Sequence, residues 1–341
     1  MKKIEHGGAL DRAMSQYGGV RSDWLDLSTG INPEPFHLPD MSSDIWNSLP
    51  DEGLLTKALN GARTYYGAAP ATAIVAAPGT QALIQLMPWM KPSGEVAVVG
   101  PTYQEHEFCF AKAGWAIRHC SSLREIPVSA GAVVIVNPNN PDGRSVDRAD
   151  LLKLAEEMAN RQGFLVVDEA FADMHPENSL AADAGKKGLI VLKSFGKFFG
   201  LAGLRLGFAL TSPETGLFLR ERLGPWAVSG PALAIAAHAF AGGEALDAFA
   251  SRLQTRRKLL SEVLAAHGLM EIGGTALFSL VRHEQAHGLH DSLCRQRVLT
   301  RKFEHFADRL RFGVPLDRND ADKLHLRLTL ALRAAQADWP K

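Results

Sequence analysis

The sequence predicts an α/β fold, with a mainly parallel sheet in a large domain and a second, smaller α+β domain. Two observations lead to this prediction. Between about residues 50 and 210, short apolar segments alternate with polar loops and amphipathic helical segments, which is typical of a parallel sheet with helices on both faces. After Trp226 the pattern changes to long helical stretches and short strands. We therefore expect a large domain over residues 41–230, and an N-terminal arm and small domain from residues 1–40 with 231–341.

The large domain opens with a helix and a strand. Apolar residues recur at helical spacing over Gly53–Tyr66, and Gly67 is a natural C-cap. Ile74–Ala77 is a short apolar run of the kind found in buried strands.

The turn after this strand is a candidate phosphate site. Gly79, Thr80 and Gln81 open the next helix, and the free N–H groups of a helix start point towards any anion bound there. The alternative is an ordinary turn from strand to helix, since many such turns look alike.

Three further strands lead to candidate site residues. Val96–Val99 is followed by Tyr103, which either stacks on a planar ring or belongs to the core. Val133–Val136 is apolar throughout, as in a strand buried on both faces, and leads into a loop rich in turn formers that contains Asn140. An amphipathic helix over 147–161 precedes the strand 164–167, and Asp168 stands at the end of that strand.

The stretch from Ser194 to Gly207 reads as a cofactor anchor. It follows the apolar run 188–192, so Lys197 falls on a loop at a strand end, where α/β folds keep their ligand sites. A lysine amine forms a Schiff base with an aldehyde, and Ser194 and Arg205 offer a hydroxyl and a planar cation for a phosphate. The alternative is a solvated lysine in a glycine-rich turn.

The smaller domain is expected to be built from three helical segments and three short strands. These are helices over 232–241, 245–267 and 320–337, and strands over 278–281, 298–300 and 310–312.

Composition excludes several classes of protein. Lys+Arg and Asp+Glu are both 37, so nothing suggests a nucleic-acid partner. The three cysteines lack CxxC spacing, which argues against a zinc site or a disulfide framework and for a reducing compartment. No apolar run is long enough to span a membrane, and no Gly-x-Gly-x-x-Gly follows a strand, which argues against a nicotinamide dehydrogenase. We expect a cytoplasmic protein without a metal.

Three motifs in order, Asn140-Pro141-Asp142-Gly143, Asp168-Glu169-Ala170-Phe171 and Ser194-Phe195-Gly196-Lys197 with Arg205, resemble those of the class I/II aminotransferases. The resemblance covers nearly the whole chain. It implies a fold type I enzyme that uses pyridoxal 5'-phosphate and forms a homodimer.

The resemblance also implies a role for each motif residue. Lys197 would carry the cofactor and later move protons, Asp168 would pair with its pyridine nitrogen, and Asn140 would donate to its phenolic oxygen. Tyr103 would stack on the ring. The cofactor phosphate would be held by Gly79, Thr80, Gln81, Ser194 and Arg205.

The opening residues are similar to those of family members that decarboxylate O-phosphothreonine to aminopropanol phosphate, the linker unit of cobalamin. The similarity lies in His6-Gly7-Gly8 and in the stretch 25–33, which contains Asn32, a candidate substrate residue. By the same resemblance Arg311, with Arg327 as a rival, would grip the substrate carboxylate. His6 and Arg301 would hold a substrate phosphate.

The chain also departs from the family pattern. Phe171 replaces a tyrosine that donates to the phenolic oxygen, Asp142 replaces a threonine, and Leu49 replaces a tyrosine that reaches the neighbour's cofactor phosphate. Transaminases tend to keep both tyrosines, so these departures favour decarboxylation. The alternatives are an aminotransferase for histidinol phosphate or an aromatic amino acid, and a non-catalytic binding protein.

Overall fold

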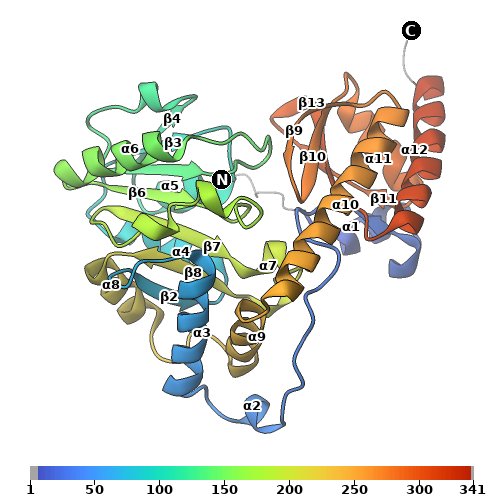
Figure 1. Ribbon diagram of the computed structural model, residues 1–341. Coiled ribbons are helices and arrows are strands. Elements are labelled where there is room, and N and C mark those ends of the chain that lie inside the picture. Colours follow the sequence, from blue (N-terminus) through green and yellow to red (C-terminus); the bar gives the residue numbers. More distant parts are fainter. Residues whose placement is uncertain (1–6, 339–341) are drawn as a thin grey trace. The chain divides into compact units, whose positions relative to one another are not determined.

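The computed structural model describes residues 7–338 and divides the chain into two compact units, each treated separately (Figure 1). The larger unit comprises Pro35–Asn140 and Arg144–Ala248. The smaller unit comprises the described parts of Met1–Glu34 and Phe249–Lys341, together with Pro141–Gly143.

The larger unit is built on a seven-stranded sheet, as the α/β prediction requires. Its strand order is β2-β8-β7-β6-β5-β3-β4, and every pairing is parallel except the two made by β8. The strands are β2 (Ala73–Ala77), β3 (Glu95–Val99), β4 (Ala116–Cys120), β5 (Ala132–Val136), β6 (Phe164–Asp168), β7 (Leu189–Ser194) and β8 (Gly207–Thr211). Strands β5, β6, β7 and β8 are buried along their whole length, which explains why their sequences are mostly apolar.

Helices cover both faces of this sheet. The helices of this unit are α2 (Asp44–Asn47), α3 (Glu52–Tyr66), α4 (Thr80–Leu86), α5 (Gln104–Lys112), α6 (Arg148–Asn160), α7 (Phe195–Phe198), α8 (Pro213–Leu223) and α9 (Gly230–Phe240). One face packs against α4, α5 and α8 in a core that includes Val98, Val166 and Leu192. The alternate residues of the same strands, such as Val167 and Val191, are buried as well, on the face that α3 and α6 help to cover.

Helix α3 forms where its apolar spacing predicts. Asp51 caps its first turn by accepting a hydrogen bond from the Leu54 N–H at 2.7 Å, and Gly67 ends it in the left-handed conformation at φ 65°. Gly61 lies against Phe240, so α3 packs closely on α9.

The units differ from the predicted domains at their boundaries. The transitions fall at 34/35 and 248/249, and not at 40/41 and 230/231. The second transition comes later than expected because α9 packs on α3 and therefore belongs to the larger unit.

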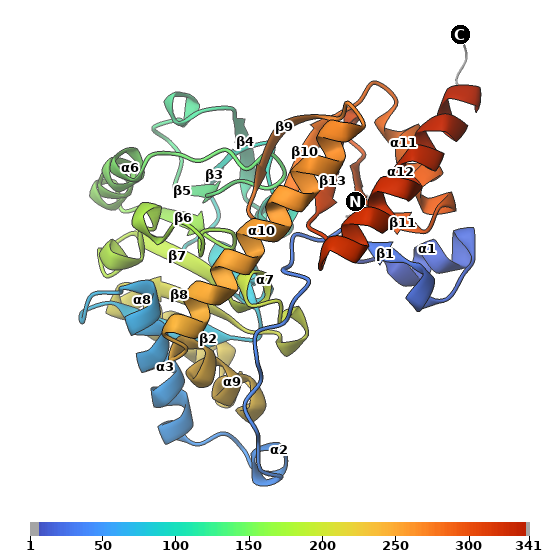
Figure 2. The ribbon, with the colours of Figure 1, turned by 45° about the vertical axis from the view of Figure 1, so that its right-hand side comes forward.

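The smaller unit holds a four-stranded antiparallel sheet of order β12-β13-β10-β9 and a parallel pair of β1 and β11 (Figure 2). The strands are β1 (Leu25–Asp26), β9 (Met270–Thr275), β10 (Phe278–Arg282), β11 (Val298–Leu299), β12 (Arg301–Phe303) and β13 (Phe306–Gly313). Helices α1 (Leu10–Tyr17), α11 (Ala286–Arg295) and α12 (Arg318–Asp338) belong to this unit, and the second boundary falls within α10 (Glu244–Ala266). None of the helices in residues 7–338 has the length and apolar character needed to cross a membrane.

Candidate active site

A cavity of about 160 Å³ lies in the larger unit, where β5, β6 and β7 end and α4 begins. The carboxyl ends of parallel strands meet at one edge of a sheet, which is where α/β proteins bind ligands. All nine residues expected to surround the cofactor line this one cavity: Gly79, Thr80, Gln81, Tyr103, Asn140, Asp168, Ser194, Lys197 and Arg205.

Two glycines allow Arg205 and the start of α4 to come together at one end of the cavity. Gly79 has φ 82°, and a Cβ there would stand 2.7 Å from Nη2 of Arg205. A Cβ on Gly207 would stand 2.6 Å from the Thr80 nitrogen. A side chain at either position would therefore push the guanidinium or the helix start away. This end of the cavity offers N–H groups, a hydroxyl and a cation, the donors that a phosphate requires.

The carboxylate of Asp168 is held from two sides. Its Oδ1 accepts a hydrogen bond from the Ala170 N–H at 3.1 Å, and its Oδ2 lies 2.9 Å from Nε2 of His106. The His106 ring is fully buried, and since a carboxylate only accepts hydrogen bonds, the ring nitrogen facing Asp168 carries the proton. These contacts fix the direction in which Asp168 faces.

Sequence reasoning missed His106. One signal in the sequence could have found it. His106 comes three residues after Tyr103, and residues at this spacing share one face of a helix, so the two side chains could be expected on the same side. The two rings are in edge contact, with centroids 6.1 Å apart.

Tyr103 and Gln81 are linked at the wall of the cavity. The tyrosine hydroxyl lies 3.4 Å from Oε1 of Gln81, and Nε2 of Gln81 donates to Glu105 at 2.7 Å. Burial, and next the negative charge of Glu105, raise the pKa of Tyr103 well above its ordinary value, so the phenol stays neutral. Its ring forms part of the cavity wall.

Lys197 lies on the short helix α7, which a cluster of aromatic side chains holds in place. Phe195 and Phe199 stack with ring centroids 4.4 Å apart, and Phe36 packs edge-on against Phe199. Nζ of Lys197 is 5.7 Å from the centre of the Phe171 ring. The backbone of the turn is therefore buried, while the lysine side chain lines the cavity.

The candidate substrate residues that the structure describes belong to the smaller unit. Arg311 on β13 is buried, and its Nη2 donates to the carbonyl of Ser28 at 3.1 Å. Arg301 on β12 is its direct cross-strand neighbour. Asn32 is buried and accepts a hydrogen bond from the Glu34 N–H at 3.2 Å. His6 lies outside the described residues.

Arg327, the rival of Arg311, is engaged with backbone groups. Its Nη1 donates to the carbonyls of Asp23 and Arg297 at 2.8 and 3.0 Å. These contacts tie α12 to the segments before β1 and β11.

The cavity fits pyridoxal phosphate. It combines an amine for the aldehyde, a fixed carboxylate for the pyridine nitrogen, an aromatic wall and a set of phosphate donors. Among the residues of this structure that can be described, no group of three or more His, Cys, Asp or Glu side chains could hold a metal ion.

Comparison with known proteins agrees with this geometry. The family model of the class I and II aminotransferases matches residues 41–328. A threonine-phosphate decarboxylase from a Sinorhizobium species is 44% identical over 319 residues, which cover 92% of this chain and 94% of the relative. The enzyme of that name from Pseudomonas aeruginosa is 43% identical over 318 residues, with the same coverage.

The fold is similar to that of solved structures at much lower sequence identity. The histidinol-phosphate aminotransferase from Sinorhizobium meliloti, in complex with pyridoxal 5'-phosphate, superimposes with a TM-score of 0.78 at 18% identity, covering 98% of this chain and 96% of that one.

Proposed function

The chain belongs to the aminotransferase class I and II family, and from this premise we propose that it decarboxylates O-phosphothreonine with the help of pyridoxal phosphate. The products are carbon dioxide and aminopropanol phosphate, since a proton replaces the carboxylate at Cα. The observation that carries the proposal is the convergence of Lys197, Asp168 and the phosphate donors on one cavity, in a chain that is 44% identical to a threonine-phosphate decarboxylase. A role in cobalamin synthesis follows from the product.

Asp168 and Lys197 would do most of the chemistry supplied by the protein. The carboxylate of Asp168, fixed by His106 and the Ala170 N–H, would face the pyridine nitrogen and keep it protonated. The chemistry that pyridoxal phosphate would supply, when these residues hold it, is a sink for the electron pair left at Cα by the departing carbon dioxide. Lys197 would hold the cofactor before the substrate arrives and afterwards return a proton to Cα.

Phe171 supports decarboxylation over transamination. It stands where the family usually has a tyrosine, and its ring offers the lysine amine an apolar surface and no hydroxyl. Asn140 would then donate to the phenolic oxygen without a second donor from this position. The same cavity could serve an aminotransferase, so the products must decide between the two reactions.

The substrate has two anionic groups, a carboxylate and a phosphate, which require cations. Two arginines on neighbouring strands of the smaller unit can supply them. Arg301 and Arg311 are direct neighbours on β12 and β13, and like charges in that arrangement are unfavourable. Burial, and next Arg301, lower the pKa of Arg311 to about 9, which leaves it charged at neutral pH. An anion would relieve this repulsion. We assign Arg311 to the substrate carboxylate, and Arg301 with His6 and Asn32 to the rest of the substrate.

We also propose a homodimer. The larger unit has an apolar cavity of about 380 Å³ lined in part by Leu55, Leu59 and Trp226, and Trp226 is 61% exposed. Trp46 and Leu49, which precede Leu55 in the sequence, are each 66% exposed. A second copy of the chain would cover these side chains. Light scattering on the protein as it elutes from a size-exclusion column would measure its mass, and we expect the mass of two chains.

One experiment separates the two candidate reactions. The purified protein is loaded with pyridoxal phosphate and incubated with O-phosphothreonine, and separately with histidinol phosphate and 2-oxoglutarate. We expect carbon dioxide from the first mixture and no glutamate from the second. Glutamate formation without carbon dioxide would overturn the proposed function in favour of the aminotransferase.

A further inference from the structure

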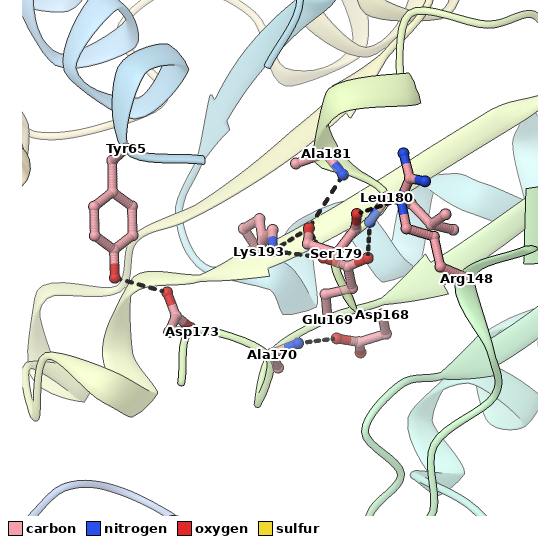
Figure 3. A network of polar contacts seen from close by, with 10 residues as sticks. All are labelled: Tyr65, Arg148, Asp168, Glu169, Ala170, Asp173, Ser179, Leu180, Ala181 and Lys193. Carbon is pink, nitrogen blue, oxygen red and sulfur yellow. Dashed lines mark hydrogen bonds and ion pairs between the residues drawn. The ribbon is translucent and has the colours of Figure 1, made fainter. Parts of the chain in front are cut away.

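A buried ion pair joins the ends of β6 and β7 beside the cavity. Nζ of Lys193 lies 2.5 Å from Oε2 of Glu169, and the two side chains are 3% and 1% exposed. Figure 3 shows the pair with Ser179, and Asp168 pointing away from it.

The side-chain hydrogen bonds of this pair go to one loop, and the ring of Tyr66 lies over Nζ of Lys193 at 5.0 Å. Oε1 of Glu169 accepts from the Leu180 N–H at 2.7 Å, and Lys193 donates to Oγ of Ser179 at 2.9 Å. Ser179 in turn donates to Glu169 and accepts from the Ala181 N–H at 3.1 Å. Both charges are therefore well supplied with partners, and the pair fixes the loop 179–181 to the sheet.

Both members of the pair are sequence neighbours of cofactor-side residues. Asp168 and Ser194 line the cavity, whereas Glu169 and Lys193 do not, because successive strand residues point to opposite faces. The last paired residues of β6 and β7 are Asp168 and Leu192, and the Glu169 N–H donates to the Leu192 carbonyl at 2.9 Å. The ion pair thus continues the connection between the strands just where their regular pairing stops.

Stability alone does not account for such a pair. A buried ion pair is often no more stabilising than apolar side chains of similar volume, because both ions must be taken out of water. What the pair does provide is a defined distance and direction between two strand ends.

We propose that Glu169 and Lys193 are positioning residues that set the spacing between Asp168 and Ser194. Through this spacing they would determine how well the carboxylate meets the ring nitrogen while the serine meets the phosphate. This inference rests on the proposed use of pyridoxal phosphate, and adds two residues that do not touch the cofactor.

The test uses the double variant Glu169→Gln/Lys193→Met in the full-length protein. Single variants would leave one buried charge without its partner and could fail to fold, whereas the double variant removes both charges at similar volume. The amide oxygen of the introduced glutamine can still accept from the Leu180 N–H, so the loop keeps that contact. Two quantities are measured: the urea midpoint of the apoprotein, and the dissociation constant and visible spectrum of added pyridoxal phosphate.

Thr211→Val is the matched control. Thr211 is fully buried on β8 and donates to the Leu189 carbonyl at 2.9 Å, at the far end of β7 from the cavity. This variant loses a buried polar contact between strands without changing either strand end at the site.

We expect the double variant to unfold near the parent's urea midpoint but to bind pyridoxal phosphate about tenfold more weakly. Metal sites lose affinity to a similar extent when the hydrogen-bond partners of their ligands are removed. Its visible band should also shift, while Thr211→Val keeps the parent's affinity and spectrum. Parental affinity and spectrum in the double variant, or an equal loss in Thr211→Val, would overturn the inference. If the parent itself binds no pyridoxal phosphate, the proposed function fails instead.

Discussion

Replacing His106 by leucine measures how far Asp168 depends on its buried partner. The His106 ring is fully buried with Nε2 2.9 Å from Oδ2 of Asp168, and leucine has no donor. A hydrogen bond to a charged group contributes about 1.5–3 kcal/mol. Since about 1.4 kcal/mol corresponds to a factor of ten in rate, kcat/KM for O-phosphothreonine should fall by about 10- to 150-fold.

The assay is release of carbon dioxide at limiting substrate, together with urea unfolding of each apoprotein. His106→Gln is the control, because its amide keeps a donor that can reach the carboxylate. The glutamine variant should retain most of the activity at a stability similar to that of the leucine variant. Equal impairment of both variants, or a leucine variant as fast as the parent, would refute the reasoning.

Four further substitutions or substrates test the site and the protein around it. Lys197→Ala should release no carbon dioxide and leave no cofactor trapped by borohydride, and trapping at full stoichiometry would place the anchor elsewhere. Asp168→Asn keeps the shape but loses the charge, so kcat should fall by about 10²- to 10³-fold, whereas a rate near that of the parent would remove Asp168 from the mechanism. Threonine should show a kcat/KM roughly a hundredfold or more below that of O-phosphothreonine, and Arg301→Ala should narrow the gap; unchanged discrimination would move the phosphate site away from Arg301. The carboxyl of Asp173 accepts a hydrogen bond from the Tyr65 hydroxyl at 3.3 Å, and burial raises its pKa to about 6, so its contribution to stability is complete below pH 3.8 and is lost as the pH rises through 6. The free energy of unfolding of Asp173→Asn, measured in urea relative to that of the parent, should therefore rise by up to about 3 kcal/mol between about pH 4 and 7.5. A difference that stays constant with pH would refute this.

The prediction of fold from sequence succeeded where a local pattern carries the information. The apolar runs of β5, β6 and β7 are buried along their length, so composition alone identifies them as internal strands. The polar segments that follow these runs lie at the carboxyl edge of the sheet, which is why Asp168 and Lys197 could be expected at one site.

The features that were missed depend on partners far apart in the sequence. The contact of His106 with Asp168 spans 62 residues, and Lys193 looks like any other lysine until the fold brings Glu169 beside it. The unit boundaries differ from the expected ones for a similar reason, since nothing local shows that α9 packs on α3.

The reversed strand β8 has a consequence for the order in which the protein folds. Strand β2 pairs in its sheet only with β8, and this pairing joins Ala73 to Thr211 across more than a hundred residues of chain. Contacts between such distant residues form late, because a long loop must close first. During synthesis, β3 to β7 can therefore pair while the turn at Gly79 still lacks its neighbours Arg205 and Gly207. The phosphate end of the cavity is completed only when the chain has grown past Thr211, so a nascent chain that ends before β8 should not retain the cofactor.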